Sequence, residues 1–157
     1  MVLFRLSSRD FRPDSGEGAR LYGGRWNQAG TPVVYASRTR ALAAEEIFAH
    51  HRAFLANSRL PFIGVPDALS LEVADPAPLP PGWPEGADET ATAAYGTEWA
   101  DSLRTAVLQV PSAAFGGAGE HNYLLNPRHP EFQRIRFEMA AEEYIDPRLR
   151  PPLVDLR

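Results

Sequence analysis

The chain contains no cysteine and no lysine, and these two absences exclude more chemistry than any single motif suggests. Without cysteine it can form no disulfide, no thiol nucleophile and no cysteine-ligated zinc or iron–sulfur centre. Without lysine it can form neither a Schiff base nor the phosphate loop of a Walker-type site. All 16 basic residues are arginines, so an anion must be held by guanidinium groups, backbone amides or helix ends.

Charge, hydropathy and histidine spacing exclude further classes of protein. The formal net charge is −4, which disfavours a surface that binds nucleic acid directly. No apolar run approaches the ~20 residues of a membrane span, and the first residues lack the layout of a secretory signal. The 4 histidines show no metal-ligand spacing, so we expect no metal site. The sequence therefore predicts a cytoplasmic protein that contacts no membrane.

The length of 157 residues and the 44% of hydrophobic residues suit a single domain, here residues 1–157. Hydrophobic periodicity predicts more strands than helices, joined by irregular connections, which indicates an α+β fold. Strands are predicted at residues 3–6, 31–37, 68–74, 104–110 and 134–139, and helices at 39–57 and 89–103. Residues 146–157 are expected to form a C-terminal tail.

Proline is unusually frequent in one segment. The chain has 15 prolines, and a third of them lie between residues 75 and 88, with Trp83 among them. Proline lacks a backbone N–H donor and fixes its own φ, so regular structure is improbable there. The segment is expected to be a surface loop or an arm that faces a partner.

The segment Tyr22-Gly23-Gly24-Arg25-Trp26-Asn27 is the first candidate for a functional loop. Two glycines allow positive φ and a close approach of the backbone to a ligand, which suits an anion cradle. Arg25 would add a bidentate clamp for a phosphate. The alternative is a tight turn whose Trp26 fills the core.

The strand that follows places two polar side chains on one face. Alternation along residues 31–37 puts Tyr35 and Ser37 on the same side of the strand. An aromatic ring there could stack on a planar ring such as a nicotinamide or a base. The alternative for Tyr35 is an ordinary core tyrosine.

The predicted helix at 39–57 contains two consecutive glutamates, Glu45 and Glu46. Glu46 falls on the same largely apolar stripe as Leu42, and a buried carboxylate is costly unless it has a partner. Glu45 falls on another stripe, where it could pair with Arg52 towards solvent. A surface glutamate at the edge of the apolar stripe remains the alternative for Glu46.

Polar residues in the C-terminal half form a further group. Ser112 lacks the Gly-x-Ser-x-Gly elbow of an esterase nucleophile. Asn122, Asn126 and His129 could contribute to a site, but all three are also good turn formers.

Taken in chain order, these segments resemble the RES-domain toxins, a family named for an Arg, a Glu and a Ser. The resemblance covers about residues 4–144. The matching motifs are Gly23-Gly-Arg25-Trp-Asn-x-x-Gly30, Thr31-Pro-Val-Val-Tyr35-Ala-Ser37, Ala41-Leu-Ala-x-x-Glu46-x-x-x-His50, Val110-Pro-Ser112 and Asn122-Tyr-Leu-Leu-Asn126-Pro-x-His129-Pro130.

The resemblance implies a mixed sheet with flanking helices, similar to the ADP-ribosyltransferase fold, and an activity on NAD. By position, the family's Arg, Tyr, Glu and Ser fall on Arg25, Tyr35, Glu46 and Ser112. The resemblance also implies inhibition by an Xre-like helix-turn-helix antitoxin. The residues expected to catalyse are Glu46, Arg25 and Tyr35, and those expected to bind substrate are Arg25, Tyr35, Ser37, Ser112, Asn122 and Asn126.

On this interpretation NAD is a substrate and the protein needs no cofactor, with water or phosphate as the acceptor of ADP-ribose. Cleavage of the nicotinamide–ribose bond passes through an oxocarbenium-like state, as glycoside hydrolysis does. Glu46 would face the developing cation, Arg25 would clamp the diphosphate and Tyr35 would stack on nicotinamide. The alternatives are a mono-ADP-ribosyltransferase that modifies a protein, a non-catalytic nucleotide- or partner-binding module, and a ribonuclease toxin.

Overall fold

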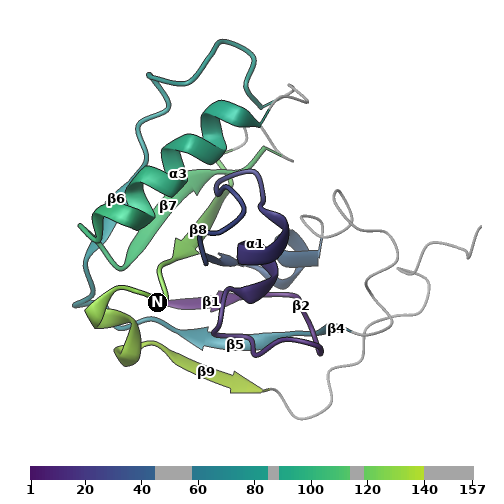
Figure 1. Cartoon of the computed structure of the whole chain (residues 1–157). Coiled ribbons are helices and arrows are strands. Elements are labelled where there is room, and N and C mark those ends of the chain that lie inside the picture. The colour runs from purple at the N-terminus through teal and green to yellow at the C-terminus, as the bar shows by residue number, and fades with distance from the viewer. Residues whose placement is uncertain (45–57, 85–88, 114–118, 140–157) are drawn as a thin grey trace, which may run out of the picture.

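A mixed seven-stranded sheet forms the centre of the computed structural model, which describes residues 1–44, 58–84, 89–113 and 119–139 (Figure 1). Its strands run in the order β6-β7-β8-β3-β1-β5-β9. Only the β6–β7 pair is parallel among the described pairs. The strands are β1 (Val2–Phe4), β3 (Val34–Ser37), β5 (Pro61–Gly64), β6 (Leu71–Val73), β7 (Val107–Pro111), β8 (His121–Leu125) and β9 (Arg136–Met139).

Smaller elements surround this sheet. The strands β2 (Ser7–Ser8) and β4 (Ser58–Arg59) form a separate two-stranded sheet. The helices are α1 (Glu17–Tyr22), α3 (Thr90–Ser102) and the 3-10 helix η2 (Pro130–Arg134). None of the helices in the described ranges is long and apolar enough to cross a membrane.

Strand alternation divides the apolar core between the two faces of the sheet. Val107 and Leu125 pack on one face, with Phe132 of η2 against the same cluster. Their chain neighbours Leu108 and Leu124 belong to the second cluster, together with Trp99 of α3. Because side chains at consecutive strand positions point to opposite faces, a sheet covered on both sides needs such apolar pairs.

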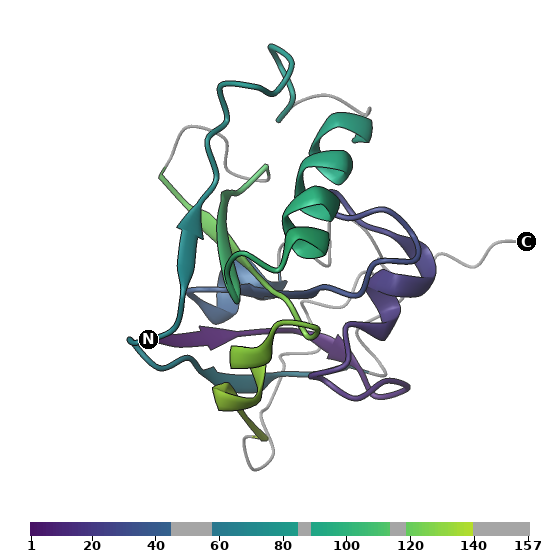
Figure 2. The same cartoon turned by 60° about the vertical axis from the view of Figure 1, so that its left-hand side comes forward.

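Helix α3 lies along β6, β7 and β8 (Figures 1 and 2). It buries one continuous stripe of residues. The stripe has the i, i+1, i+4, i+7, i+8 spacing of a helix face that is buried on one side. Its members are Thr92, Ala93, Gly96, Trp99 and Ala100. The large indole at this stripe is completely buried and its Nε1 donates to Thr105 Oγ1 at 2.8 Å.

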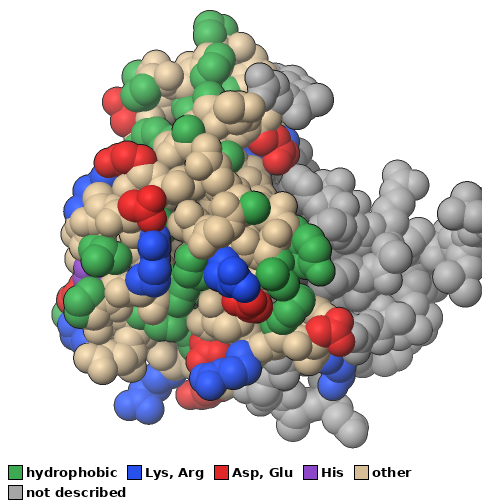
Figure 3. Space-filling model, viewed as in Figure 1, with side chains coloured by type: hydrophobic (Ala, Val, Ile, Leu, Met, Phe, Trp, Pro, Cys, Tyr) green, Lys and Arg blue, Asp and Glu red, His purple; other side chains and the backbone are tan. Residues whose placement is uncertain are grey.

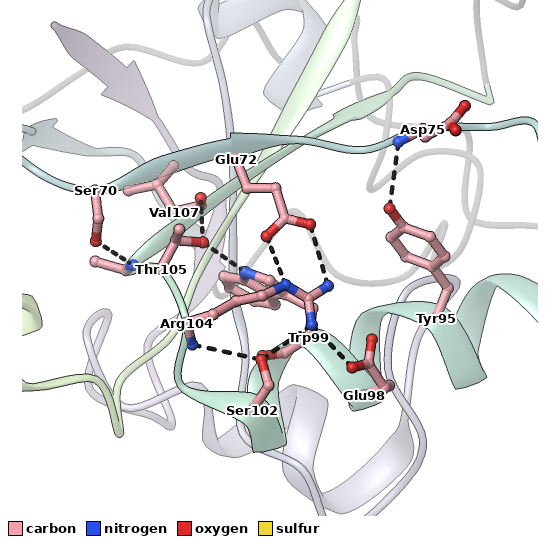
Figure 4. Close-up of polar contacts among 11 residues, drawn as sticks. Ser70, Glu72, Asp75, Tyr95, Glu98, Trp99, Ser102, Arg104, Thr105 and Val107 are labelled. Atoms are coloured by element: carbon pink, nitrogen blue, oxygen red, sulfur yellow. Dashed lines mark hydrogen bonds and ion pairs between the residues drawn. The ribbon is translucent and has the colours of Figure 1, made fainter.

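A charged cluster fixes the C-terminal end of α3 against the edge strand β6 (Figure 4). The Arg104 guanidinium donates to both carboxylate oxygens of Glu72, at 2.7 and 3.1 Å, and to Glu98 at 2.8 Å. These contacts hold the pKa of Arg104 above its ordinary value. Oppositely charged side chains also lie beside one another elsewhere on the face in Figure 3. At an exposed position each such pair contributes little on its own, about 0–1 kcal/mol.

The proline-rich segment is irregular over its described residues 75–84, as its composition predicts. It packs against its own domain: Leu79 is buried in the cluster beneath α3. The Trp83 ring lies edge-on to Trp26, with 5.4 Å between ring centroids. The segment contains two tight turns. In them the carbonyl oxygens of Pro76 and Pro80 accept hydrogen bonds from the backbone N–H groups of Leu79 and Trp83, respectively. Whether it also faces a partner stays a prediction.

The α+β class and five of the predicted strands are confirmed, as is the helix at 89–103, with shifts of a few residues at their ends. Six of the described elements have no counterpart in the sequence prediction. They are the short β2, β4 and η2, together with β5, which begins with a proline and ends with a glycine, α1, which buries no side chain completely, and β8, which contains the predicted turn former Asn122. Each lacks the run of alternating or helix-spaced apolar residues on which the prediction depended.

The start of the predicted helix at 39–57 is confirmed. The backbone N–H of Leu42 donates to Thr39 Oγ1 at 3.1 Å, so Thr39 caps the N-terminus of this helix. The residues from 45 to 57, Glu45 and Glu46 among them, lie outside the described residues.

We predict that Gly96→Ala destabilises the fold, whereas Gly18→Ala does not. A Cβ at Gly96 would lie 2.0 Å from the Trp26 carbonyl oxygen, so α3 would have to move away from the loop before β3. A Cβ at Gly18 meets only the Phe11 ring, at 3.7 Å. We expect Gly96→Ala to lose about 1–3 kcal/mol of unfolding free energy in thermal or urea melts. Equal melting of the two variants would contradict the close approach of helix and loop.

Candidate functional site

A cavity of about 420 Å³ opens between the N-terminal segment, the α1 region and β3. Its size lies within the range of ~300–1,000 Å³ that is usual for small-molecule sites. The polar side chains that line it come from segments far apart in the chain and include Arg5, Ser7, Arg25, Tyr35, Ser37, Glu89 and Asn122. Arg25, Tyr35, Ser37 and Asn122 are thus brought together as the sequence analysis expects.

The glycines before Arg25 are required by the shape of the loop. Gly23 has a φ of 73°, a left-handed conformation in which a side chain would be strained. A Cβ at Gly24 would lie 2.8 Å from the Tyr35 hydroxyl oxygen. The loop closes through backbone hydrogen bonds in both directions between Gly24 and Asn27. Two small residues therefore let the loop fold directly over the end of the Tyr35 side chain.

Asn27 anchors this loop, a function that the sequence analysis missed. Its side chain is 1% exposed. Its Nδ2 donates to the carbonyl oxygens of Ala19, Gln28 and Thr31, at 2.9, 3.1 and 3.0 Å. Its Oδ1 accepts from the Tyr35 hydroxyl at 2.7 Å. The available signal was a polar side chain next to a core tryptophan, since a buried amide must have its hydrogen bonds satisfied.

Arg25 is held at the cavity by two contacts, one with the proline-rich segment and one with the residue directly before α3. Its Nη2 lies 3.1 Å from a carboxylate oxygen of Glu89, and its Nη1 donates to the Trp83 carbonyl oxygen at 3.4 Å. The Arg25 side chain is only 16% exposed. The guanidinium is therefore positioned before any ligand arrives, and an anion that binds there must compete with one carboxylate.

Tyr35 and Ser37 share the cavity face of β3, as strand alternation predicts. The Tyr35 hydroxyl accepts from the Trp26 backbone N–H at 3.0 Å in addition to donating to Asn27. The Ser37 hydroxyl donates to Asn122 Oδ1 at 2.7 Å and ties β3 to β8. The Tyr35 hydroxyl is thus committed to the loop, which leaves the ring as the part of this side chain that can meet a ligand.

Arg5 is a second cavity cation, and the sequence analysis did not single it out. Its Nη1 donates to the Tyr35 carbonyl oxygen at 2.9 Å, while its Nε is buried and finds no hydrogen-bond partner in the described structure. The Ser7 hydroxyl oxygen, at the same cavity, is also buried and finds no hydrogen-bond partner in the described structure. Burial lowers the pKa of Arg5 to about 10, because desolvation disfavours the charged form. A partly buried cation that forms no ion pair with a carboxylate among the described residues suits an anionic ligand.

Ser112 and Asn126 are buried, but neither lines the cavity. The Ser112 backbone N–H donates to the Glu120 carbonyl oxygen at 2.9 Å, and its neighbour Ala113 does reach the cavity. Asn126 Nδ2 donates to the Ala100 carbonyl oxygen at 2.8 Å, so this amide joins the end of β8 to α3. The turn interpretation holds for Asn126, whose Oδ1 accepts from a backbone N–H two residues later.

Glu46, the expected catalytic carboxylate, cannot be placed because it lies outside the described residues. Ala43, three positions earlier in the chain, lines the cavity. Within the described ranges, no group of three histidine, aspartate or glutamate side chains could hold a metal ion.

A family model for the RES domain matches residues 2–146, which is most of the chain. The chain belongs to the RES-domain family. This confirms the resemblance to RES-domain toxins on which the interpretation of the motifs rested.

Curated relatives cover nearly the same length. The chain is 40% identical over 139 residues to a protein of Sphingobium sp. named "Prs ADP-ribosylating toxin", covering 86% of this chain and 85% of the relative. It is 36% identical over 143 residues to a "Toxin Res" of Pseudomonas putida, covering 88% and 93%. A solved chain of the M. tuberculosis MbcT–MbcA toxin–antitoxin complex shares the fold, with a TM-score of 0.70 at 24% identity over 94% of this chain and 85% of that one.

We predict that Tyr35→Phe destabilises the protein although it keeps the ring. The substitution leaves the Asn27 Oδ1 and the Trp26 N–H without their partner at a buried site. We expect a loss of about 1–3 kcal/mol of unfolding free energy. Tyr95→Phe is the matched control, because that hydroxyl only accepts from the Asp75 N–H at an exposed position, and it should melt like the wild type. If both variants melted alike, the proposed anchoring of the loop by Tyr35 would be wrong.

Proposed function

We propose that this RES-domain toxin depletes NAD by cleaving the bond between nicotinamide and ribose. The observation that carries the proposal is that one cavity gathers Arg25, Tyr35, Ser37 and Asn122, four residues of the family motifs, from β3, β8 and the glycine loop. The cavity adds Arg5, a partly buried cation whose Nε has no hydrogen-bond partner among the described residues. Together these groups suit a ligand that carries both a diphosphate and a planar aromatic ring.

The negatively charged diphosphate of NAD would lie against the cavity arginines Arg5 and Arg25. Arg25 supplies a guanidinium that is already fixed by Glu89 and the Trp83 carbonyl. Guanidinium groups hold phosphate oxygens with paired, charge-assisted hydrogen bonds. The Arg5 Nε and the Ser7 hydroxyl offer further donors that have no partner in the described structure. In this proposal the two arginines act by binding and orientation and exchange no proton.

The chemical step needs stabilisation of positive charge on the ribose and little else. As the C1′–N bond breaks, nicotinamide leaves as a neutral molecule and the sugar becomes oxocarbenium-like. The Glu46 carboxylate would accept a hydrogen bond from a ribose hydroxyl and stabilise this charge electrostatically. The Tyr35 ring would pack against nicotinamide while its hydroxyl stays bonded to Asn27. Water or phosphate then forms the new bond at C1′, and the acceptor's proton passes to solvent.

A second acceptor is a protein side chain. The relative from Sphingobium is named as an ADP-ribosylating toxin, and it covers 86% of this chain. The same cavity chemistry serves both outcomes, because transfer differs from hydrolysis only in the nucleophile that attacks C1′.

We expect the purified protein to release nicotinamide from NAD, and Glu46→Gln to slow release by about 100-fold or more, since an electrostatic contact made in the transition state is lost. Glu45→Gln is the matched control: it removes the same charge one position earlier and should keep near-normal turnover. Parallel reactions with and without phosphate, and with labelled NAD in a cell extract, identify the acceptor. Loss of activity in Glu45→Gln alone would assign the catalytic carboxylate to the other residue.

No nicotinamide release by folded wild-type protein, with or without extract, would overturn NAD cleavage. Label that appears on a protein band, with little free ADP-ribose, would favour the second candidate.

We further propose that an antitoxin of the Xre-like helix-turn-helix class inhibits this chain. The support is the shared fold with a chain from a toxin–antitoxin complex. We expect expression of the chain alone to arrest growth, and co-expression of a small neighbouring gene to restore it. Glu46→Gln should be harmless without the partner. Soluble, folded wild-type protein that leaves growth unaffected would contradict the proposal.

A further inference from the structure

A second hollow, of about 500 Å³, lies next to the cavity and is more open to solvent. Four residues line both: Tyr22, Gly23, Gly24 and Glu89. The same loop that carries Arg25 therefore forms the rim between the two hollows. Nothing in the proposed chemistry at the ribose uses the second one.

Tyr22 is the unusual residue of this rim. It is 77% exposed, more than any other large hydrophobic side chain of the described core and surface. The other aromatic residues nearby are packed: Trp26 contacts the rings of Trp83 and Tyr95. In the described part of the chain, the Tyr22 ring contacts no other aromatic ring. A tyrosine ring left in water at the edge of a cavity is available to stack on a planar ring of a ligand.

The position of Arg25 bears on where the two ends of a dinucleotide can bind. A dinucleotide carries one aromatic heterocycle on each side of its diphosphate. If Arg25 binds the diphosphate and Tyr35 contacts one heterocycle inside the cavity, the shared rim offers the other heterocycle a direct path into the second hollow. The glycines at 23 and 24 have no side chains to obstruct this path, and Gly23 keeps the backbone in a conformation that other residues rarely adopt.

We propose that the second hollow binds the adenine end of NAD, with the Tyr22 ring stacked on the purine base. The inference rests on the proposed NAD function and names the part of that substrate which the cavity itself leaves unassigned. Stacking suits an exposed tyrosine because a base has an apolar face and a ring loses little conformational freedom on binding. The exposed Gln28 also borders the hollow and offers an amide towards the edge of a bound base.

The test compares ligands that contain only one end of NAD. Calorimetry measures the binding of ADP, which has adenine and two phosphates, and of nicotinamide mononucleotide, which has no adenine. We expect Tyr22→Ala to weaken ADP binding by roughly 5- to 150-fold, the range that loss of base stacking gives, and to leave the mononucleotide unaffected. Tyr22→Phe should bind ADP like the wild type. In turnover, Tyr22→Ala should raise KM for NAD with little change in kcat.

The matched control is Leu21→Ala, which removes the neighbouring exposed side chain of α1, 44% exposed, and should bind both ligands normally. Wild-type protein that does not bind ADP, or a Tyr22→Ala variant that binds it normally, overturns the proposal. Equal weakening of both ligands also overturns it, because Tyr22 would then shape the Arg25 loop rather than contact adenine. If NAD is bound but not cleaved, the binding measurements still decide, so failure of the proposed function is distinguishable from failure of this inference.

Discussion

The hydrogen bond between Tyr35 and Asn27 is the contact on which the rest of the site depends. It joins a strand at the centre of the sheet to a loop that has no regular structure of its own. Asn27 then fastens the loop to Ala19 within α1 and to Thr31 before β3, and it also bonds the Gln28 carbonyl of the loop itself. Arg25 lies in this loop, and Tyr22 is the last residue of α1, directly before it. The loop is therefore held in place by a buried amide that itself needs no contact with a ligand.

Asn27 stabilises the site, whereas Arg5 lowers the stability of the fold at neutral pH and suits the binding of an anion. A partly buried guanidinium whose Nε has no partner in the described structure costs free energy, and the lowering of its pKa to about 10 by desolvation reflects that cost. The folded-state pKa lies below the usual value, so this unfavourable contribution is present while the group is charged and fades only as the pH rises through about 10. At neutral pH an anionic ligand would remove the cost, and part of its binding free energy would come from this relief.

Local pattern explains what the sequence could predict. Strand alternation placed Tyr35 and Ser37 on one face, and helical spacing identified α3. By contrast, β8 begins with residues typical of turns, and Asn122 lies in a strand because Ser37 and the β7 backbone pair with it. Arg5 was overlooked because one strand pattern cannot reveal which neighbours will bury a guanidinium. Such features depend on contacts between distant segments, which composition and periodicity do not encode.

The pair between Arg25 and Glu89 constrains how any phosphate can enter. A free guanidinium at this place would be drawn to many anions, whereas a guanidinium that already contacts Glu89 must exchange one anion for another. The exchange keeps Arg25 ordered, so little side-chain entropy is lost when a phosphate arrives, but it also reduces the net gain in electrostatic free energy. Binding must then draw on other contacts, at Arg5 and along the rim. The arrangement favours a ligand long enough to reach several of these points over a small single anion, and a dinucleotide has that length.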